Sequence, residues 1–398
     1  MSPFPDNPKQ VLPREAYTDD NWFERERASL LSKTWHLACM AFDLKKVGDF
    51  KTLDLFGFPI FVIRSSENEI AAFHNLCRHR GTELVEGSSN CGKTIVCPYH
   101  RWTYALDGRL RGLPDRAECF PDFDRDSHGL KPIGIGVFKE MVFVNLDDPG
   151  GKTFEEWIAP LRGHEWPHEI SASGLKASEP FIYEIKCNWK VFHENAIDGY
   201  HLAYLHENTL GGPKASANIW ECHGKSMAWY STERDNIKNR IPVFVETQAG
   251  IGATKVPGAD EPGYAGVYLL FPTTIVTPSP WSLTISTIRP TSARTMELIA
   301  QTYVPDSWFS AREHPRQAPG YDKATNTIRS DNWTKPPLET GDFQTEDIWV
   351  CEKMQRSLAS PAYSVGQLAR GSGGEAALEV FQQHVATYMH QSEVENHT

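Results

Sequence analysis

The chain has 398 residues, of which 40% are apolar, and a formal net charge of −11. This length allows two domains or one large domain with a sizeable core, and the negative charge argues against nucleic acid or an anionic membrane as a partner. No apolar run approaches the ~20 residues that a membrane-spanning helix needs, and the N-terminus lacks a signal-peptide pattern. Eight cysteines are too sparse for a disulfide scaffold. We therefore expect a cytoplasmic protein.

The first part of the chain predicts a helix followed by short strands. Apolar residues at roughly helical spacing predict a helix over Asp20–Cys39. Short runs separated by Gly and Asp predict an antiparallel β domain, with strands at Phe50–Leu55, Ile60–Arg64, Glu69–Phe73 and Val137–Asn145. Turn residues at 147–151 predict a boundary. The expected division is an N-terminal helical segment at 1–40, a domain at 41–150 and a second domain at 151–398.

The second domain is predicted to be α+β, with a long sheet between helices and a cavity. Asn188 is placed to cap a helix that runs through residues 191–206. Strands are expected at Phe181–Ile185, Gly266–Pro278, Ser282–Pro290 and Glu297–Val304, and later helices at Glu346–Ser357 and Glu375–Met389.

Two short clips in the first domain each combine a cysteine with a histidine: Cys77-Arg78-His79 and Cys97-Pro98-Tyr99-His100. Such a set can hold zinc, or a two-iron two-sulfur cluster in which histidines ligate one iron. Structural zinc sites usually build each clip from one residue type, so the mixed clips favour the cluster. We expect Cys77 and Cys97 on one iron and His79 and His100 on the other. Histidine ligation raises the cluster potential, to roughly −150 to +300 mV.

A second group of polar residues lies on the helix predicted after Asn188. At about 100° per residue, Glu194, Asp198 and His201 share one face of an ideal helix, but His206 lies about 140° from His201. Both histidines can bind one metal only if the helix is distorted or ends between them. The spacing alone is equally compatible with a half-exposed helix that has a polar face.

Together these motifs resemble those of a known family. The run CRHRGTELVEG…CPYHRWTYALDG resembles the cluster-binding loops of Rieske proteins. The pattern NWK…EN-x₂-D-x-YH-x₄-H resembles the iron-binding helix of Rieske non-heme iron oxygenases, in the large (α) subunit of the aromatic ring-hydroxylating type. The resemblance implies a Rieske domain followed by a helix-grip (Bet v1-like, START-like) domain. It also implies a [2Fe-2S] cluster, a mononuclear Fe(II), and a homotrimer (α₃) or α₃β₃ assembly.

The resemblance also implies roles for individual residues. His201 and His206 would hold the mononuclear iron together with a carboxylate from a late helix, which leaves positions open for dioxygen and substrate. We assign that carboxylate to Asp347, with Glu346 as its rival. Alternatively, Asp347 is not a ligand, and its negative charge complements the dipole at a helix N-terminus.

Asp198 would hydrogen-bond a metal-bound histidine of its own chain and, by position, His100 of the partner subunit. It would thereby connect the two metal sites for electron transfer. His74, His193 and Cys351 match no ligand position and are expected to be structural.

The chain has no Gly-rich dinucleotide fingerprint, so electrons are expected from a separate NAD(P)H-dependent reductase, with or without a ferredoxin between them. The expected activity is that of a terminal oxygenase that hydroxylates an aromatic substrate, carboxylated or not, with O₂. The residue at position 198 favours this branch, since carnitine-oxidising relatives often carry Glu there. The alternative is monooxygenation or N-demethylation of a betaine-like quaternary ammonium compound, for which twelve Trp and thirteen Tyr could form an aromatic cage. A Rieske electron carrier or a zinc module would leave most of the chain without a role.

Overall fold

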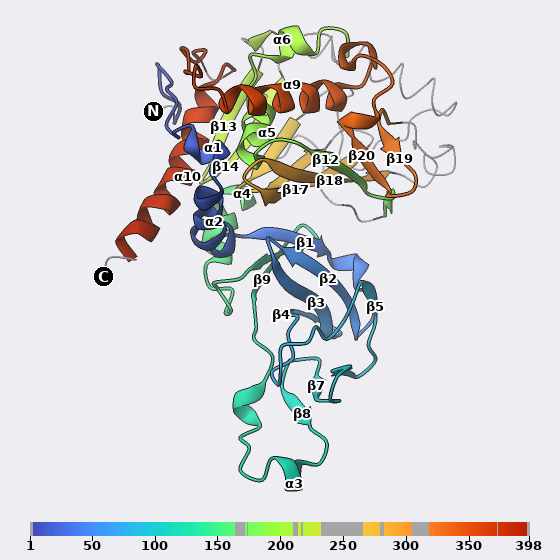
Figure 1. Cartoon of the computed structure of the whole chain (residues 1–398). Coiled ribbons are helices and arrows are strands. Elements are labelled where there is room, and N and C mark those ends of the chain that lie inside the picture. Colours follow the sequence, from blue (N-terminus) through green and yellow to red (C-terminus); the bar gives the residue numbers. More distant parts are fainter. Residues whose placement is uncertain are drawn as a thin grey trace. The chain divides into compact units, whose positions relative to one another are not determined.

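The computed structural model describes residues 3–163, 172, 174–209, 214–215, 218–231, 266–278, 282–304, 318–371 and 373–395. The chain divides into two compact units. One contains residues 31–159, and the other contains residues 1–30 and 160–398 (Figure 1). We call them the cluster unit and the iron unit, after the groups that the sequence predicts for them. The divisions lie near the boundaries expected at 40 and 150, but the N-terminal segment belongs to the iron unit. Among the described residues, no helix has the length and apolar character needed to span a membrane.

The N-terminal helical region is shorter than its apolar spacing predicts. Helix α1 (Glu15–Thr18) is followed by α2 (Asp20–Ser29), which Asp19 caps by accepting from Trp22 N at 2.8 Å. The helix expected to reach Cys39 is wrong in its last part, because His36–Met40 is strand β1. This strand pairs antiparallel with β10 (Met141–Asn145). An apolar run of this length fits either state, and pairing with a distant strand decides it.

The cluster unit is an antiparallel β structure, as expected. Its four-stranded sheet has the order β4-β3-β2-β5, and two three-stranded sheets have the orders β6-β7-β8 and β1-β10-β9. The bounds are β2 (Asp49–Leu55), β3 (Phe58–Ser66), β4 (Glu69–His74), β5 (Ser88–Asn90), β6 (Thr94–Val96), β7 (Thr103–Ala105), β8 (Leu110–Gly112) and β9 (Gly134–Phe138). The short helix α3 (Arg116–Cys119) also lies in this unit, and α4 (Phe154–Arg162) begins at its end. Each clip follows the end of a strand, β4 for Cys77 and β6 for Cys97.

The iron unit is built on a ten-stranded mixed sheet, and this confirms the α+β class (Figure 1). Its path is β13-β14-β15-β16-β17-β18-β12-β20-β19, with β11 paired to β18. Strands β12 and β20 are parallel, whereas the other described pairs in this sheet are antiparallel. The bounds are β11 (Lys176–Ala177), β12 (Phe181–Ile185), β13 (Asn218–His223), β14 (Ser226–Ser231), β15 (Gly266–Leu270), β16 (Thr274–Pro278), β17 (Leu283–Ser292), β18 (Thr295–Val304), β19 (Tyr321–Asp322) and β20 (Thr327–Arg329).

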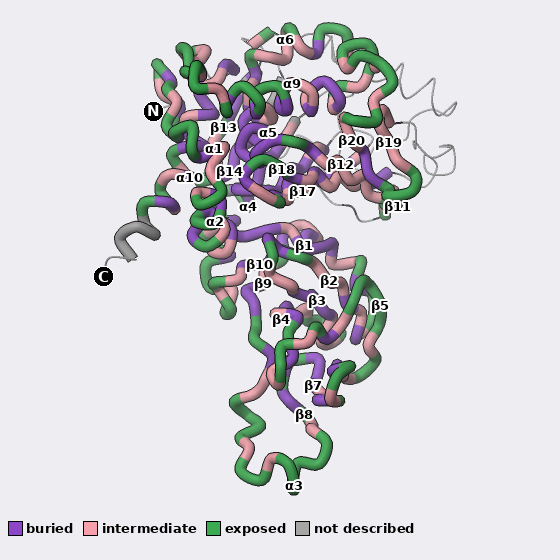
Figure 2. The backbone as a smooth tube through the Cα atoms, in the orientation of Figure 1, coloured by how far each residue is buried: buried purple, intermediate pink, exposed green. Residues whose placement is uncertain are grey.

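Four helices of this unit bear on the site: α5 (Trp189–Ala196), α6 (Leu202–Leu205), α9 (Phe343–Leu358) and α10 (Ala376–Glu395). The predicted cap is confirmed, because the Asn188 side chain accepts from Lys190 N at 3.0 Å. Helix α5 contacts both α9 and β17, and Figure 2 shows it buried. The helix expected to run through residue 206 instead ends at Ala196.

A buried polar network holds α5 against the N-terminal helices. Lys190 Nζ lies 2.6 Å from Glu26 Oε1, and both side chains are fully buried. Glu194 Oε1 accepts from the Tyr17 hydroxyl at 2.6 Å and from Gln382 Nε2 of α10 at 3.0 Å. Removing one partner of such a buried pair leaves an uncompensated charge, so the network fixes the position of α5.

Candidate metal centres

The two clips of the cluster unit lie on loops that fold alike, 77–82 and 97–102. In both, the N–H of the cysteine donates to the carbonyl of the sixth loop residue at 2.8 Å. The cysteine carbonyl accepts from the N–H of the fifth residue, at 2.9 Å in the first loop and 3.1 Å in the second. That fifth residue has a positive φ in both loops, +76° at Gly81 and +60° at Arg101. The left-handed turn closes each loop and holds its cysteine in place.

The four side chains of the clips converge in matched pairs. His79 Nδ1 lies 3.1 Å from His100 Nδ1, and the buried thiols of Cys77 and Cys97 interact directly. Two nitrogens bound to one tetrahedral metal at about 2.1 Å would lie about 3.4 Å apart, close to this separation. The pairing matches the one predicted from the clips, and the donor set suits a cluster with two thiolates on one iron and two imidazoles on the other. Ligation by these residues remains a prediction.

Burial and neighbouring side chains together shift the pKa values of these groups. Burial is the main cause that lowers the pKa of His79, and His100 and Arg80 add to it, which favours the neutral form that a ligand needs. Burial raises the pKa of the Cys77 thiol, and a hydrogen bond with Tyr104 acts in the opposite direction. The Tyr104 hydroxyl lies 3.3 Å from Cys77 Sγ.

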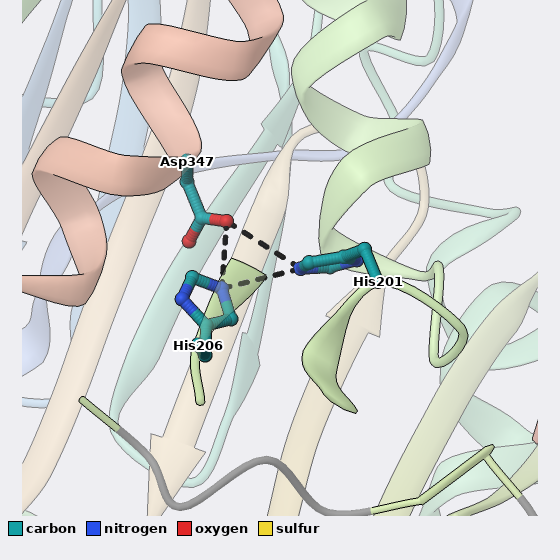
Figure 3. Close-up of side chains that lie close together, drawn as sticks. All are labelled: His201, His206 and Asp347. Carbon is teal, nitrogen blue, oxygen red and sulfur yellow. Dashed lines mark hydrogen bonds and ion pairs between the residues drawn. The ribbon is translucent and has the colours of Figure 1, made fainter. Parts of the chain in front are cut away.

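The second centre lies in the iron unit, where His201, His206 and Asp347 point toward one another (Figure 3). His206 Nε2 lies 3.0 Å from Asp347 Oδ1 and 3.2 Å from His201 Nε2, and the third side of the triangle measures 3.5 Å. Ligands at right angles and about 2.1 Å from a metal lie about 3 Å apart, so the triangle fits one face of an octahedron. Two histidines and one carboxylate so arranged are the donor set of non-heme Fe(II) oxygenases.

The break in the helix makes this convergence possible. Helix α5 ends at Ala196, α6 begins at Leu202, and His206 directly follows α6. The backbone packs tightly here, since a Cβ on Gly199 would lie 2.3 Å from the carbonyl oxygen of Gly373. The two histidines therefore meet through the turn that the sequence left open as one of its alternatives.

The apo triangle is stabilised by opposite charges. Burial disfavours the charged form of His201, but hydrogen bonds to Asp198 and Asp347 outweigh it and raise its pKa to about 10. Burial likewise acts to raise the pKa of Asp347, yet hydrogen bonds from His201 and His206 hold it well below its ordinary value.

The structure gives the two neighbouring carboxylates of α9 different positions. Asp347 belongs to the triangle, and its Oδ1 also accepts from Asn195 Nδ2 at 2.8 Å. Glu346 lies outside it and accepts from His206 Nδ1 at 2.7 Å. Sequence reasoning did not identify the contact made by Asn195, although the EN pair before the histidines includes this residue.

Asp198 lies beside His201, but not through helical spacing. It belongs to the segment between α5 and α6, where its Oδ1 accepts from Tyr200 N at 2.7 Å. Its Oδ2 lies 3.4 Å from His201 Nδ1. The shared helical face expected for Glu194, Asp198 and His201 is wrong, because the helix has ended. A turn brings the carboxylate to the histidine instead.

Comparisons with known proteins agree with both centres. Residues 172–391, more than half of the chain, match the family described as "Ring hydroxylating alpha subunit (catalytic domain)", and residues 34–124 match the "Rieske [2Fe-2S] domain". The chain is an α subunit of the Rieske non-heme iron oxygenase family. Subunits of this family hold a Rieske [2Fe-2S] cluster and a mononuclear non-heme iron, and the two donor sets described above fit these groups.

Relatives of this α subunit include oxygenases of quaternary ammonium compounds. The glycine betaine monooxygenase oxygenase subunit of Pseudomonas aeruginosa is 35% identical over 199 residues, which cover 50% of this chain and 45% of that protein. This chain therefore spans less than half of the length of that relative. The chloroplastic choline monooxygenase of Spinacia oleracea is 26% identical over 368 residues, 89% of this chain and 73% of that protein.

Solved structures show the same fold. A quaternary ammonium Rieske monooxygenase has a TM-score of 0.71 at 22% identity, covering 96% of each chain. Naphthalene 1,2-dioxygenase from Rhodococcus also has a TM-score of 0.71, at 17% identity, covering 95% of this chain and 94% of that one. Equal likeness to both means that the fold does not distinguish between their substrates.

The residues set aside in the sequence have structural positions in this α subunit. His193 is buried and stacks on Phe381 with ring centroids 4.0 Å apart. Cys351 is fully buried, with its Sγ 3.9 Å from Val191 O. His74 is the last residue of β4. Packing explains His193 and Cys351, as expected.

Proposed function

We propose that this α subunit is the terminal oxygenase of a system that oxidises a quaternary ammonium compound. The observation that carries the proposal is the similarity to choline monooxygenase over 89% of the chain, together with that to glycine betaine monooxygenase over half of it. These relatives favour the second of the two substrate classes expected from the sequence. The first class, an aromatic ring, has the support of Asp at position 198 and of the fold.

The proposed reaction is a monooxygenation of a carbon beside the ammonium group. One atom of O₂ enters a C–H bond, and the other leaves as water after two electrons and two protons are taken up. When bound, the two metal groups supply electron transfer and a site for dioxygen next to the substrate. His201, His206 and Asp347 would hold the iron. The electrons would come from a separate reductase.

An aromatic pair in the sheet offers a place for the cation. Trp220 and Trp229 are buried cross-strand partners of β13 and β14, with ring centroids 6.5 Å apart. Asn218 precedes Trp220 by two residues, so both side chains leave the same face of β13. Its Nδ2 donates to Gly199 O at 3.2 Å, which puts this face against the segment that leads to His201. Indole faces attract quaternary ammonium ions by about 0.5–2 kcal/mol.

Electron delivery would require a second copy of the chain. Asp198 is 17% exposed beside His201, and Tyr200 and Tyr204 next to it are 46% and 69% exposed. We infer that this accessible edge receives the cluster unit of the partner subunit in a homotrimer or α₃β₃ assembly. Asp198 would then accept from His201 and from the partner's His100 at the same time.

A single-turnover substrate screen tests the proposal without knowledge of the natural reductase. The protein is loaded with Fe(II), its cluster is reduced chemically, and oxygen uptake is measured with choline, glycine betaine and carnitine. Benzoate and naphthalene serve as the aromatic comparison, and His206→Ala as the inactive control. Substrate-dependent uptake with an oxidised ammonium product is expected. If only the aromatic compounds were turned over, the proposal would be wrong and the activity would be aromatic ring hydroxylation.

A further inference from the structure

We propose that Glu346 is a positioning residue, which holds the His206 ring with its proton on Nδ1 so that Nε2 faces the metal. The inference rests on the proposed iron site and extends it to a residue that does not itself touch the metal. Sequence spacing treats Glu346 and Asp347 as rivals for one role. The structure assigns them two.

The contacts of Glu346 are short and shielded from water. Its Oε2 lies 2.7 Å from His206 Nδ1, and each side chain is only 1% exposed. Oε2 also accepts from the Thr209 hydroxyl and so acts as an acceptor, which assigns the shared hydrogen to Nδ1. In the neutral ring this leaves a lone pair on Nε2. Nε2 is the atom that lies 3.0 Å from Asp347 Oδ1 in the triangle.

A second donor fixes the carboxylate itself. The Thr209 hydroxyl donates to the same oxygen of Glu346 at 2.7 Å, and Thr209 N donates to His206 O at 3.3 Å. Glu346 thus binds both ends of the segment 206–209, which follows α6. Because Glu346 contacts a side chain at each end of this short segment, it limits rotation of the His206 ring.

The helix that carries Glu346 couples the two carboxylates. Successive helical residues point about 100° apart, so Asp347 can face the triangle while Glu346 faces the far side of the His206 ring. The first turn of α9 is held by Asp342, whose side chain accepts from Thr345 N at 2.7 Å. A single rigid element therefore sets the position of the ligand and of the group that orients its neighbour.

Each histidine of the triangle then has its own carboxylate on Nδ1. Asp198 Oδ2 lies 3.4 Å from His201 Nδ1, and Glu346 Oε2 lies 2.7 Å from His206 Nδ1. The contact of Glu346 with His206 is shorter and buried, so water cannot replace it. It therefore orients its histidine more strongly than Asp198 orients His201. Asp198, which is 17% exposed, remains accessible to another group.

Titration with Co(II) of protein that has lost its mononuclear iron but kept its cluster tests the proposal without turnover. Binding is followed by the Co(II) absorption above that of the cluster. Glu346→Leu should bind Co(II) about 10- to 100-fold more weakly than wild type, as losses of such orienting groups do. Glu346→Gln should be weakened less, because its amide oxygen can still accept from Nδ1. Thr209→Val should weaken binding by a smaller factor. The Co(II) absorption bands of Glu346→Leu should also shift, because no side chain at position 346 then accepts from Nδ1 and the ring is no longer held in one orientation.

Glu352→Gln is the matched control on the same helix. Glu352 is 8% exposed, and its Oε1 accepts from Lys186 N at 3.1 Å and Ser330 Oγ at 3.0 Å, so the change removes a buried carboxylate away from the triangle. It should leave Co(II) affinity and bands unchanged. Wild-type affinity and bands in Glu346→Leu, with binding lost in His206→Ala, would overturn the role of Glu346 alone. Equal binding by wild type and His206→Ala would instead refute the iron site, and with it both proposals.

Discussion

His206 Nε2 and Asp347 Oδ1 lie 3.0 Å apart, although 141 residues separate them in the sequence. One belongs to the segment after α6 and the other to the first turns of α9. The site therefore forms only when α9 has packed on the α5 region, and a metal that binds it stabilises that packing. Loss of the iron should lower the stability of the iron unit as well as abolish its activity.

Replacing Cys97 with Ser should remove the visible absorption of the cluster and destabilise the cluster unit. The thiolate pair with Cys77 would be broken in a buried site, where nothing else can complete the donor set. Absorption spectra and iron and zinc contents measure the effect. Cys91→Ser, whose Sγ contacts Gly48 O outside the two loops, is the control and should keep the spectrum. An unchanged spectrum in Cys97→Ser would remove Cys97 from the cluster.

His201→Ala, His206→Ala and Asp347→Ala should each abolish turnover and mononuclear iron binding while the cluster spectrum stays intact. Each change removes one corner of the triangle, and two remaining ligands hold iron weakly. Iron content per chain, with the absorption spectrum as an internal reference, measures this. Asp331→Ala, an exposed carboxylate in the same unit, should behave as wild type. If Asp347→Ala kept its iron and Glu346→Ala lost it, the assignment of the two residues would be reversed.

Asp198→Ala should retain both metal groups and the fold, yet lose turnover on the order of 100-fold. The carboxylate beside His201 would no longer join the two sites, because it is the group that can accept from two imidazoles at once. Asp198→Asn should be similarly impaired. The measurement is the rate at which a pre-reduced cluster reoxidises on addition of substrate and dioxygen. A wild-type rate in Asp198→Ala would show that electrons take another route.

Glu194→Gln should remove a pH dependence of stability from the iron unit. Burial raises the pKa of Glu194 to about 7, although hydrogen bonds from Tyr17 and Gln382 act the other way. The folded protein thus binds this proton more tightly than the unfolded chain, so the stabilisation is present below pH ~4.5 and is lost as pH rises through ~7. The difference amounts to at most about 3 kcal/mol.

Urea denaturation at pH 5 and pH 8 measures this effect. The free energy of unfolding of wild type should fall more between these two pH values than that of Glu194→Gln. Glu24→Gln, which changes an exposed carboxylate on α2, should retain the wild-type slope. Parallel slopes for wild type and Glu194→Gln would show that the group titrates normally.

Features that depend on residues close together in the sequence could be predicted from the sequence. The mixed clips, the cap at Asn188 and the antiparallel strands of the cluster unit all rest on local patterns. The strand at His36–Met40 could not be recognised, because a helix there is excluded only by the pairing of this segment with β10. The parallel pairing of β12 with β20 has no local signal either, since it joins residues such as Ile182 and Thr327.

In the candidate site, too, the residues could be named from local motifs, but their mutual arrangement could not. The three members of the triangle could be named from motifs and resemblance, but the spacing did not say whether Glu346 or Asp347 faces His206 Nε2. That depends on the rotation of α9, which packing determines. The contact of the Tyr104 hydroxyl with Cys77 spans 27 residues and follows from the folded sheet alone.

The first thirty residues pack with the iron unit, so the cluster unit is an insertion within the chain of the iron unit, and chain order differs from domain order. Truncation of the N-terminus would strip Glu26 from Lys190 and so damage the iron unit. The ends of the inserted unit adjoin each other, with the Trp35 and Phe154 rings 4.9 Å apart and Trp35 Nε1 3.1 Å from Thr153 Oγ1. A segment cut at 31 and 159 therefore carries both cysteine–histidine clips between adjacent ends.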